Sequence, residues 1–308
     1  MSTDEDAQTQ DKLTQAQLTA IEHEIKSTQP LTSQLLPISA LLHQYSNNAT
    51  NDDDGTDEQH QSAGFIQSAQ FLSTKYTSLR RVRGDGNCYY RAFLYSLCEH
   101  LLLQNNNKTG LSIEFSRIKT KIVDSLKWVC QFGYEEMTID MFHEELVELF
   151  DFIETSLTCA ANDKSTPDDT LQQLHAKLNE ENSTSDYCTW YLRVLTAAQM
   201  KSNPDRFLPF LLADDVNMMM DIPTYCSRKV EPMGKECGMV TVAALAECLG
   251  VKVVIEYMDG RCGSGGEVVN HVFGQIDVEN GGDGKVEEKE DRICLTLLYR
   301  PGHYDILY

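Results

Sequence analysis

The amino-acid sequence predicts an α+β fold, because helical and strand-forming patterns fall in different halves of the chain. Across residues 65–220 the apolar residues recur at helical spacing, and 93–101 is a clear example. Later the pattern changes: residues 251–257 alternate apolar and polar side chains, while 268–273 and 293–300 are rich in residues that favour strands. Helices followed by strands are typical of a single α+β domain.

The first 63 residues are expected to form an acidic leader, ahead of a domain that covers residues 64–308. The leader holds eleven acidic residues and two lysines, a net charge of −9. In Asp11–Ser27, apolar residues at positions 18, 21 and 25 predict a short amphipathic helix that ends near Pro30. A second apolar segment follows at 31–45, and the polar residues 47–63 predict a flexible loop. The helix either packs on its own domain or binds a partner.

Charge and composition exclude several classes of protein. The chain has 26 Lys and Arg against 47 Asp and Glu, a net charge of −21, which opposes binding to nucleic-acid phosphates. No run approaches the ~20 apolar residues that span a bilayer, and the N terminus lacks the pattern of a secretion signal. The ten cysteines are scattered, without a C-x-x-C pair. We therefore expect reduced thiols in a protein of the cytosol or nucleus, with no membrane or nucleic-acid partner.

The segment around Cys88 carries the clearest chemical signal. Gly84 and Gly86 bracket Asp85, which allows a tight turn just before a helical pattern begins. A thiol at a helix N terminus faces unpaired N–H groups and the positive end of the helix dipole, and both favour the thiolate. Residues 75–91 also carry a net charge of +4. The same turn can direct N–H groups at the oxyanion of an acyl-transfer reaction.

A candidate base and its carboxylate stand near the C-terminal end. Residues 301–302, Pro-Gly, predict a turn into a strand over 303–308. Because side chains alternate along a strand, His303 and Asp305 share one face, as the pair in a Cys-His-Asp triad requires. Each residue taken singly has a structural alternative: Cys88 as a buried thiol, His303 as a partly buried histidine, Asp305 as a turn or surface carboxylate. Sequence spacing alone does not bring Cys88 to His303.

Two segments resemble the active-site blocks of the otubains, deubiquitinases of the ovarian-tumour-domain cysteine protease superfamily. They are residues 85–93 (DGNCYYRAF) and 299–308 (YRPGHYDILY). Shorter segments between them are similar to otubain segments in the same order: 183–187, 191–193, 230–233 and 254–259. The resemblance spans roughly 65–308, with weaker similarity at 24–45.

The resemblance implies a papain-like fold with helices around a small β-sheet, and a deubiquitinase that hydrolyses ubiquitin conjugates. At matching positions Cys88 is the nucleophile, His303 the general base and acid, and Asp305 the residue that orients His303. Asp85 shapes the loop that builds the oxyanion hole. The implied substrate is ubiquitin joined through an isopeptide bond, often in the polyubiquitin chains that signal proteasomal degradation. No metal or organic cofactor is implied.

Two other functions stay open. The family resemblance also suggests a non-catalytic regulator that binds ubiquitin and inhibits ubiquitin-conjugating enzymes. The segments similar to that surface are Gln131–Met137 and Ser185–Leu192, with ordinary loops or core helix faces as the alternative. A papain-like protease acting on general peptides is the third function, and it predicts cleavage of unfolded proteins.

The resemblance also suggests residues that contact ubiquitin. Phe207, Tyr225, Tyr257 and His271 lie in segments similar to those lining the distal ubiquitin site, with burial in the core as the alternative. The helix predicted at 11–27 would contact a second, proximal ubiquitin. Its apolar stripe is too narrow to hold an isolated helix, so we expect it to fray in the free protein and to order on binding.

The sequence departs from the family pattern in a few places. Gly84 stands where the best-known animal otubain has proline, and Tyr89 where it has phenylalanine. The insertions at 47–63 and 274–292 look longer. No departure removes a reacting atom: tyrosine keeps an aromatic ring, and glycine for proline loosens the approach to the turn, which slows catalysis without abolishing it.

Overall fold

The protein consists of helices around a mixed sheet, seen in a computed structural model. The structure describes residues 17, 19–21, 23–48, 57–104, 111–159, 167–214, 220–261, 266–274 and 293–308. Its helices are α2 (Ser39–Asn48), α3 (Asp57–Lys75), α4 (Cys88–Gln104), α5 (Ile113–Val129), α6 (Glu136–Cys159), α7 (Pro167–Leu178), α8 (Thr184–Ser202), α9 (Pro204–Asp214), α10 (Ile222–Tyr225) and α11 (Met239–Leu249), with shorter helical turns at η2 (Cys130–Phe132) and η3 (Cys226–Val230). Its strands are β1 (Leu36–Pro37), β2 (Ser78–Arg80), β3 (Lys252–Tyr257), β4 (Val269–Phe273), β5 (Cys294–Arg300) and β6 (His303–Leu307).

The strand that carries His303 and Asp305 lies inside the sheet. The strand order is β1-β2-β6-β5-β3-β4, so β6 has a partner on each side. β3 and β5 run parallel, and the other neighbouring pairs are antiparallel. β5 and β6 form a hairpin in which Arg300 pairs with His303, and Gly302 in the turn adopts a φ of +74°. Hydrogen bonds to β2 and β5 therefore fix the backbone of β6, which carries both His303 and Asp305.

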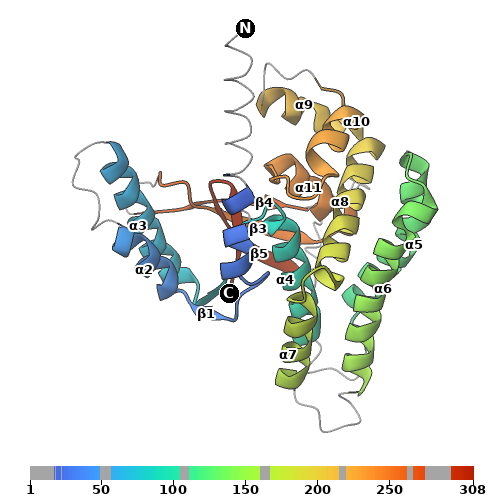
Figure 1. Cartoon of the computed structure of the whole chain (residues 1–308), viewed down its shortest axis with the longest axis horizontal. Coiled ribbons are helices and arrows are strands. Elements are labelled where there is room, and N and C mark those ends of the chain that lie inside the picture. The colour runs from blue at the N-terminus through green and yellow to red at the C-terminus, as the bar shows by residue number, and fades with distance from the viewer. Residues whose placement is uncertain are drawn as a thin grey trace, which may run out of the picture.

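Two layers of helices enclose the sheet (Figure 1). α2 and α3 lie on one side, and α4 to α11 lie on the other. Along β6, Tyr304 and Ile306 pack into the main core with α4, while Leu307 joins a smaller core with α2 and α3. Because side chains alternate on a strand, His303 and Asp305 share the face of Leu307.

The α+β prediction is confirmed, and the four strands predicted in the back half correspond to β3, β4, β5 and β6. The structure adds β1 within the predicted apolar segment 31–45 and β2 within the predicted helical region 65–220. These strands are two and three residues long. A strand that short cannot show alternation, so the hydrophobic pattern did not reveal either one.

The N-terminal segment splits into an exposed and a buried part. Residues 23–28 are helical, as predicted, and Ile21 before them is 53% exposed. Leu31 and Leu41, by contrast, are 1% and 0% exposed. Residues 49–56 of the predicted loop lie outside the described residues, and α3 begins at Asp57, inside the range predicted as loop. The domain division at residue 63 stays a prediction.

Two further features concern the described residues alone. No helix among them is long and apolar enough to cross a membrane. The cysteines whose side chains are described are free thiols.

Candidate active site

Cys88 is the first residue of α4 and is only 3% exposed. The chain reaches it through a sharp turn at Gly86, which has a φ of +75°. A Cβ at Gly86 would lie 2.2 Å from the carbonyl oxygen of Gly234, so only glycine fits there. The turn therefore presents the thiol at a helix N terminus, where the backbone N–H groups have no intrahelical partner.

Asp85 shapes this turn with its carboxylate. Oδ1 accepts a hydrogen bond from the N–H of Asn87 at 3.0 Å, and both oxygens accept from Nη1 of Arg91 at 2.5 Å. Nη2 of Arg91 donates to Asp186 at 2.6 Å. Burial alone would lower the pKa of Arg91, but the two carboxylates raise it. The turn is thereby bonded to the first turns of α4 and α8.

Three N–H groups in the turn can receive an oxyanion. Those of Asp85, Gly86 and Cys88 donate no hydrogen bond within the described part of the chain. N–H groups at a helix start stabilise developing negative charge without reorganising.

On β6, His303 and Asp305 form a hydrogen bond of 3.0 Å between Nε2 and Oδ1. Asp305 is completely buried, and it also accepts from the N–H of Val82 at 3.0 Å and from Nη2 of Arg300. Burial alone would raise the pKa of Asp305. The bond with His303 and the charge of Arg300 outweigh burial and hold the pKa of Asp305 below its ordinary value. Asp305 therefore stays ionised beside the imidazole.

The environment of His303 favours its protonated form. Burial by itself lowers the pKa of His303, but interactions with Asp305 and with Cys88 raise it from 6.5 to about 9. Because Asp305 occupies Nε2, Nδ1 is the ring nitrogen left for the thiol. The structure thus brings Cys88 and Asp85 from the first third of the chain to His303 and Asp305 near its end.

Sequence reasoning missed the arginines that hold these carboxylates. Arg91 was counted only as one of several positive charges, although it stands inside the segment 85–93. Arg300 was not assigned a role. Arg300 pairs with His303 across the β5–β6 hairpin. Because a two-residue turn fixes the register of a hairpin, the turn predicted at 301–302 was enough to place Arg300 opposite His303.

The four residues predicted to contact ubiquitin lie in two different places: Phe207 and Tyr225 in one helical core cluster, and Tyr257 and His271 on strands β3 and β4. Phe207 is 2% exposed and packs in a core cluster with partly buried Tyr225, whereas Phe210 on the same helix is 59% exposed. The exposed aromatic side chain of α9 is therefore Phe210, not Phe207. Tyr257 and His271 lie on neighbouring strands with ring centroids 5.6 Å apart, and His271 is exposed.

The departures at Gly84 and Tyr89 fit the surrounding structure. The Tyr89 hydroxyl donates to the carbonyl of Val242 at 3.3 Å, so the added oxygen has a partner inside the core. A Cβ at Gly84 would lie 3.6 Å from Nδ1 of His303, an ordinary contact distance. The backbone at position 84 therefore leaves room for a Cβ beside the imidazole.

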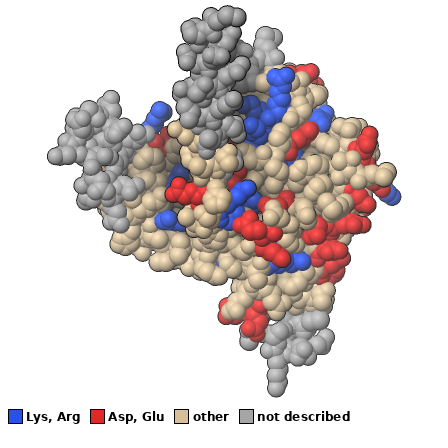
Figure 2. All heavy atoms as spheres, in the orientation of Figure 1, with Lys and Arg blue, Asp and Glu red and all other residues tan. Residues whose placement is uncertain are grey.

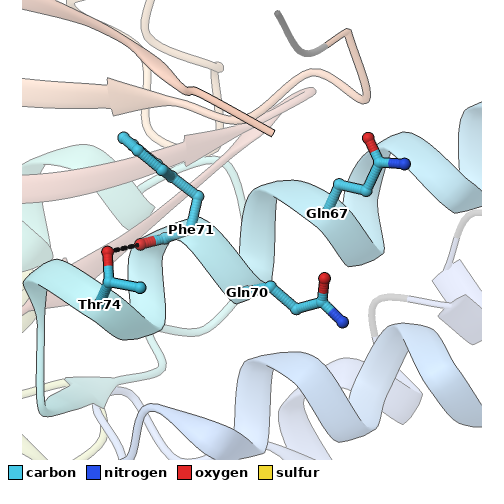
Figure 3. Close-up of a pocket in the computed structure, with 4 residues that line it drawn as sticks. All are labelled: Gln67, Gln70, Phe71 and Thr74. Atoms are coloured by element: carbon cyan, nitrogen blue, oxygen red, sulfur yellow. Dashed lines mark hydrogen bonds between the residues drawn. The ribbon is translucent and has the colours of Figure 1, made fainter. Parts of the chain in front are cut away.

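Other kinds of site have little support in the described residues. Among them, no three His, Cys, Asp or Glu side chains gather as a metal ion would need. A hollow of about 430 Å³ lies along α3, lined by Gln67, Gln70, Phe71 and Thr74 (Figure 3). None of the predicted site residues lines this hollow.

Comparison with known proteins supports the predicted resemblance. A family model described as Peptidase C65 Otubain matches residues 24–308. Ubiquitin thioesterase OTUB1 of Homo sapiens is 33% identical over 298 residues, which are 97% of this chain and 90% of that protein. The OVARIAN TUMOR DOMAIN-containing deubiquitinating enzyme 1 of Arabidopsis thaliana is 34% identical over 245 residues, 79% of this chain and 73% of that protein.

Solved structures show the same architecture. The structure of h/ceOTUB1 with ubiquitin aldehyde and UBCH5B~Ub matches with a TM-score of 0.70 and 27% identity, covering 97% of this chain and 98% of that chain. The corresponding complex with UBC13~Ub matches with a TM-score of 0.71 at the same identity and coverage. These similarities define the class of the protein, a thiol peptidase with an α+β fold. The chain belongs to the otubain family, peptidase C65.

Proposed function

We propose that this chain is a cysteine-dependent deubiquitinase that hydrolyses the isopeptide bond of ubiquitin conjugates with Cys88, His303 and Asp305. The observation that carries the proposal is a buried thiol at the start of α4 that interacts with an imidazole hydrogen-bonded to a buried carboxylate. The names of the relatives support ubiquitin as the substrate. The preferred substrates are polyubiquitin chains that signal proteasomal degradation.

In the first half-reaction the Cys88 thiolate attacks the carbonyl carbon of the terminal glycine of ubiquitin. The electron pair of the carbonyl moves to oxygen, and the free N–H groups of the turn stabilise this oxyanion. When the intermediate collapses, the C–N bond breaks and His303 gives its proton to the leaving lysine amine. The product is a thioester between Cys88 and ubiquitin.

In the second half-reaction water releases ubiquitin. Neutral His303 takes a proton from water as the water oxygen attacks the thioester carbonyl. Collapse of the second intermediate breaks the C–S bond, which restores the thiolate and the imidazolium. Asp305 keeps His303 in one orientation and stabilises its charge in both steps.

The proposal is tested with the purified full-length protein and a panel of di-ubiquitins of every linkage. Cys88→Ala should abolish cleavage, because no other group in the mechanism supplies the nucleophile. Cys294→Ala is the matched control, since Cys294 is an exposed thiol on β5. Intact di-ubiquitin of every linkage, or a wild-type rate in Cys88→Ala, contradicts the proposal. Cleavage of unfolded proteins instead of ubiquitin indicates a general peptidase.

A second function, inhibition of ubiquitin-conjugating enzymes, is supported by the two complexes that contain UBCH5B~Ub and UBC13~Ub. The segment Gln131–Met137 ends in a side chain suited to such contact: Met137 is 97% exposed, and Met141 one turn later is 53% exposed. Figure 2 shows acidic side chains along this flank of the molecule, where α5 and α6 lie. The segment Ser185–Leu192 contributes less surface, because most of it is buried in α8.

This second function predicts inhibition that does not need the thiol. The protein should slow the discharge of ubiquitin from a charged ubiquitin-conjugating enzyme, and Cys88→Ala should inhibit equally. Met137→Glu should weaken inhibition, whereas Ile113→Glu, a change at a residue 87% exposed on α5, should not. Equal effects of the two substitutions would remove the Met137 surface from this function.

A further inference from the structure

Arg193 on α8 is a fully buried guanidinium whose acceptors are all uncharged. The side chain is 0% exposed. Nη1 donates to the carbonyl of Val230 at 2.9 Å, and Nη2 contacts the carbonyls of Gly86 and Lys235 and Oδ1 of Asn87, each at 2.8 Å. None of the ion pairs formed among the described residues includes Arg193.

Keeping this charge buried is costly. An ionised group without an opposite charge loses its hydration, and the desolvation lowers the pKa of Arg193. The ring of Tyr90, 4.5 Å from the guanidinium carbon, offsets part of the cost. An apolar side chain would fill the same space without this cost. A costly buried cation therefore points to a role beyond packing.

The acceptors of Arg193 belong to two loops that meet at the catalytic turn. Gly86 and Asn87 form the turn before Cys88, and Val230 and Lys235 belong to the segment 230–235. The two loops also touch directly, because the N–H of Gly234 donates to Oδ1 of Asn87 at 2.9 Å. Asn87 Oδ1 thus accepts from both Gly234 and Arg193.

We propose that Arg193 is a positioning residue for the oxyanion turn: by holding the carbonyl of Gly86 and the side chain of Asn87, it fixes the orientation of the N–H groups that face the reacting carbonyl. The inference rests on the proposed hydrolysis of ubiquitin conjugates. It adds a residue that lies on α8, a different helix from the one that carries the nucleophile.

The arrangement requires arginine rather than lysine. A guanidinium presents several N–H groups in one plane and reaches acceptors on both loops at once. A lysine ammonium keeps the charge, but it is a compact point that cannot span the same set of acceptors. Arg193→Lys therefore separates the geometry of the contact from its charge.

The test compares two reactions of the same thiol. Turnover of ubiquitin carrying a C-terminal fluorophore passes through an oxyanion, whereas alkylation of Cys88 by iodoacetamide does not. Arg193→Lys should lower kcat by about 100-fold, the effect of losing one oxyanion donor, and should leave KM within about threefold. The rate of Cys88 alkylation should change by less than about threefold over the whole pH range.

Arg117→Lys is the matched control. Arg117 also donates to two backbone carbonyls, those of Leu249 and Gly250 at the end of α11. This variant should lose thermal stability without losing kcat. An unchanged kcat in Arg193→Lys, or an equal loss in turnover and alkylation, overturns the inference. If wild-type protein is alkylated but cleaves no ubiquitin substrate, the proposed function fails and the inference fails with it.

A second variant probes the same contact from the turn. Asn87→Ala removes the oxygen that Arg193 and Gly234 share, and it should also lower kcat while sparing alkylation. Both substitutions break the same set of hydrogen bonds. The kcat of the double variant should therefore be no more than about threefold below that of the less active single variant. Losses that multiply would show that the two side chains act independently, against the inference. If Arg193→Lys folds poorly, Asn87→Ala alone decides the question: an unchanged kcat, or an equal loss in turnover and alkylation, overturns the inference.

Discussion

The catalytic turn and the helical segment 23–28 meet at Arg83, yet they are held in different ways. Hydrogen bonds hold the turn from several sides: Asp85 accepts from Arg91, and Asn87 accepts from the N–H of Gly234. The helical segment has exposed or half-exposed side chains, and Arg83 holds its C-terminal end. Nε of Arg83 donates to the carbonyl of Gln29 at 2.8 Å, and Nη2 contacts the carbonyl of Lys26 at 3.4 Å.

This difference fits the tasks that we expect of the two regions. Transition-state stabilisation needs donors fixed within fractions of an ångström, which directional bonds to charged groups provide. The resemblance predicts that the helical segment contacts a second ubiquitin, and such a contact would need exposed surface and would tolerate fraying. Gly84 lies between the two regions, because its N–H donates to the side chain of Gln29 at 3.3 Å and a Cβ added to it would lie 3.6 Å from Nδ1 of His303.

Among changes at the catalytic residues and the turn, the largest effect is expected from Asp305→Asn. Without the carboxylate the pKa of His303 should fall from about 9 toward 6.5, so less imidazolium is available to protonate the leaving amine. We expect kcat to fall by about 100-fold or more, and the alkaline limb of the pH–rate profile to move to lower pH. An alkaline limb that stays near 9 would contradict the assigned role of Asp305.

The same pair predicts how stability depends on pH. The raised pKa of His303 means that its stabilising contribution is complete below about 6.5 and is lost as the pH rises through about 9. Chemical denaturation at a series of pH values should show this loss in the wild-type protein. The slope should become shallower in Asp305→Asn.

Next in size is the loss of the arginine that braces Asp85. Arg91→Met leaves the carboxylates of Asp85 and Asp186 without their cation, and breaking such a partly buried network costs about 3 kcal/mol of unfolding free energy. Urea denaturation measures this loss. The turnover of a ubiquitin substrate should fall by about tenfold. Full activity with reduced stability would mean that Asp85 does not shape the oxyanion turn.

A smaller and more selective effect is expected from the exposed helical segment near the N terminus. Deleting residues 1–28 removes the exposed helix but keeps Gln29, which contacts Arg83 and Gly84. Reaction with ubiquitin carrying a small C-terminal probe should change by less than about twofold, whereas turnover of di-ubiquitin should drop several-fold because a weak contact is lost. If both rates fall equally, the helix belongs to the catalytic core.

The smallest effect is expected from Tyr89→Phe. The change removes one hydroxyl and leaves the carbonyl of Val242 without that donor, which costs roughly 1 kcal/mol of stability. The aromatic packing against Tyr304, with ring centroids 5.3 Å apart, stays in place. Activity should stay within about twofold of wild type, and a larger loss would assign the hydroxyl a role in catalysis.

Local sequence patterns were sufficient for features that depend on neighbouring residues. The glycines around Asp85 indicated a turn before a helix, and strand alternation placed His303 and Asp305 on one face. These relations follow from backbone geometry over a few positions, so no knowledge of the rest of the chain is needed. The family resemblance then linked the two segments.

Only the tertiary structure decided which distant residues complete the site. The contact of Val82 with Asp305 joins residues 223 positions apart, and that of Arg193 with Asn87 joins residues 106 positions apart. Such contacts depend on how β6 sits between β2 and β5 and on how α8 packs against α4. Hydrophobic periodicity records which face of an element is buried, but not which element buries it. For that reason the sequence indicated the reacting groups, while the contacts of the buried Arg91 and Arg193 emerged only from the fold.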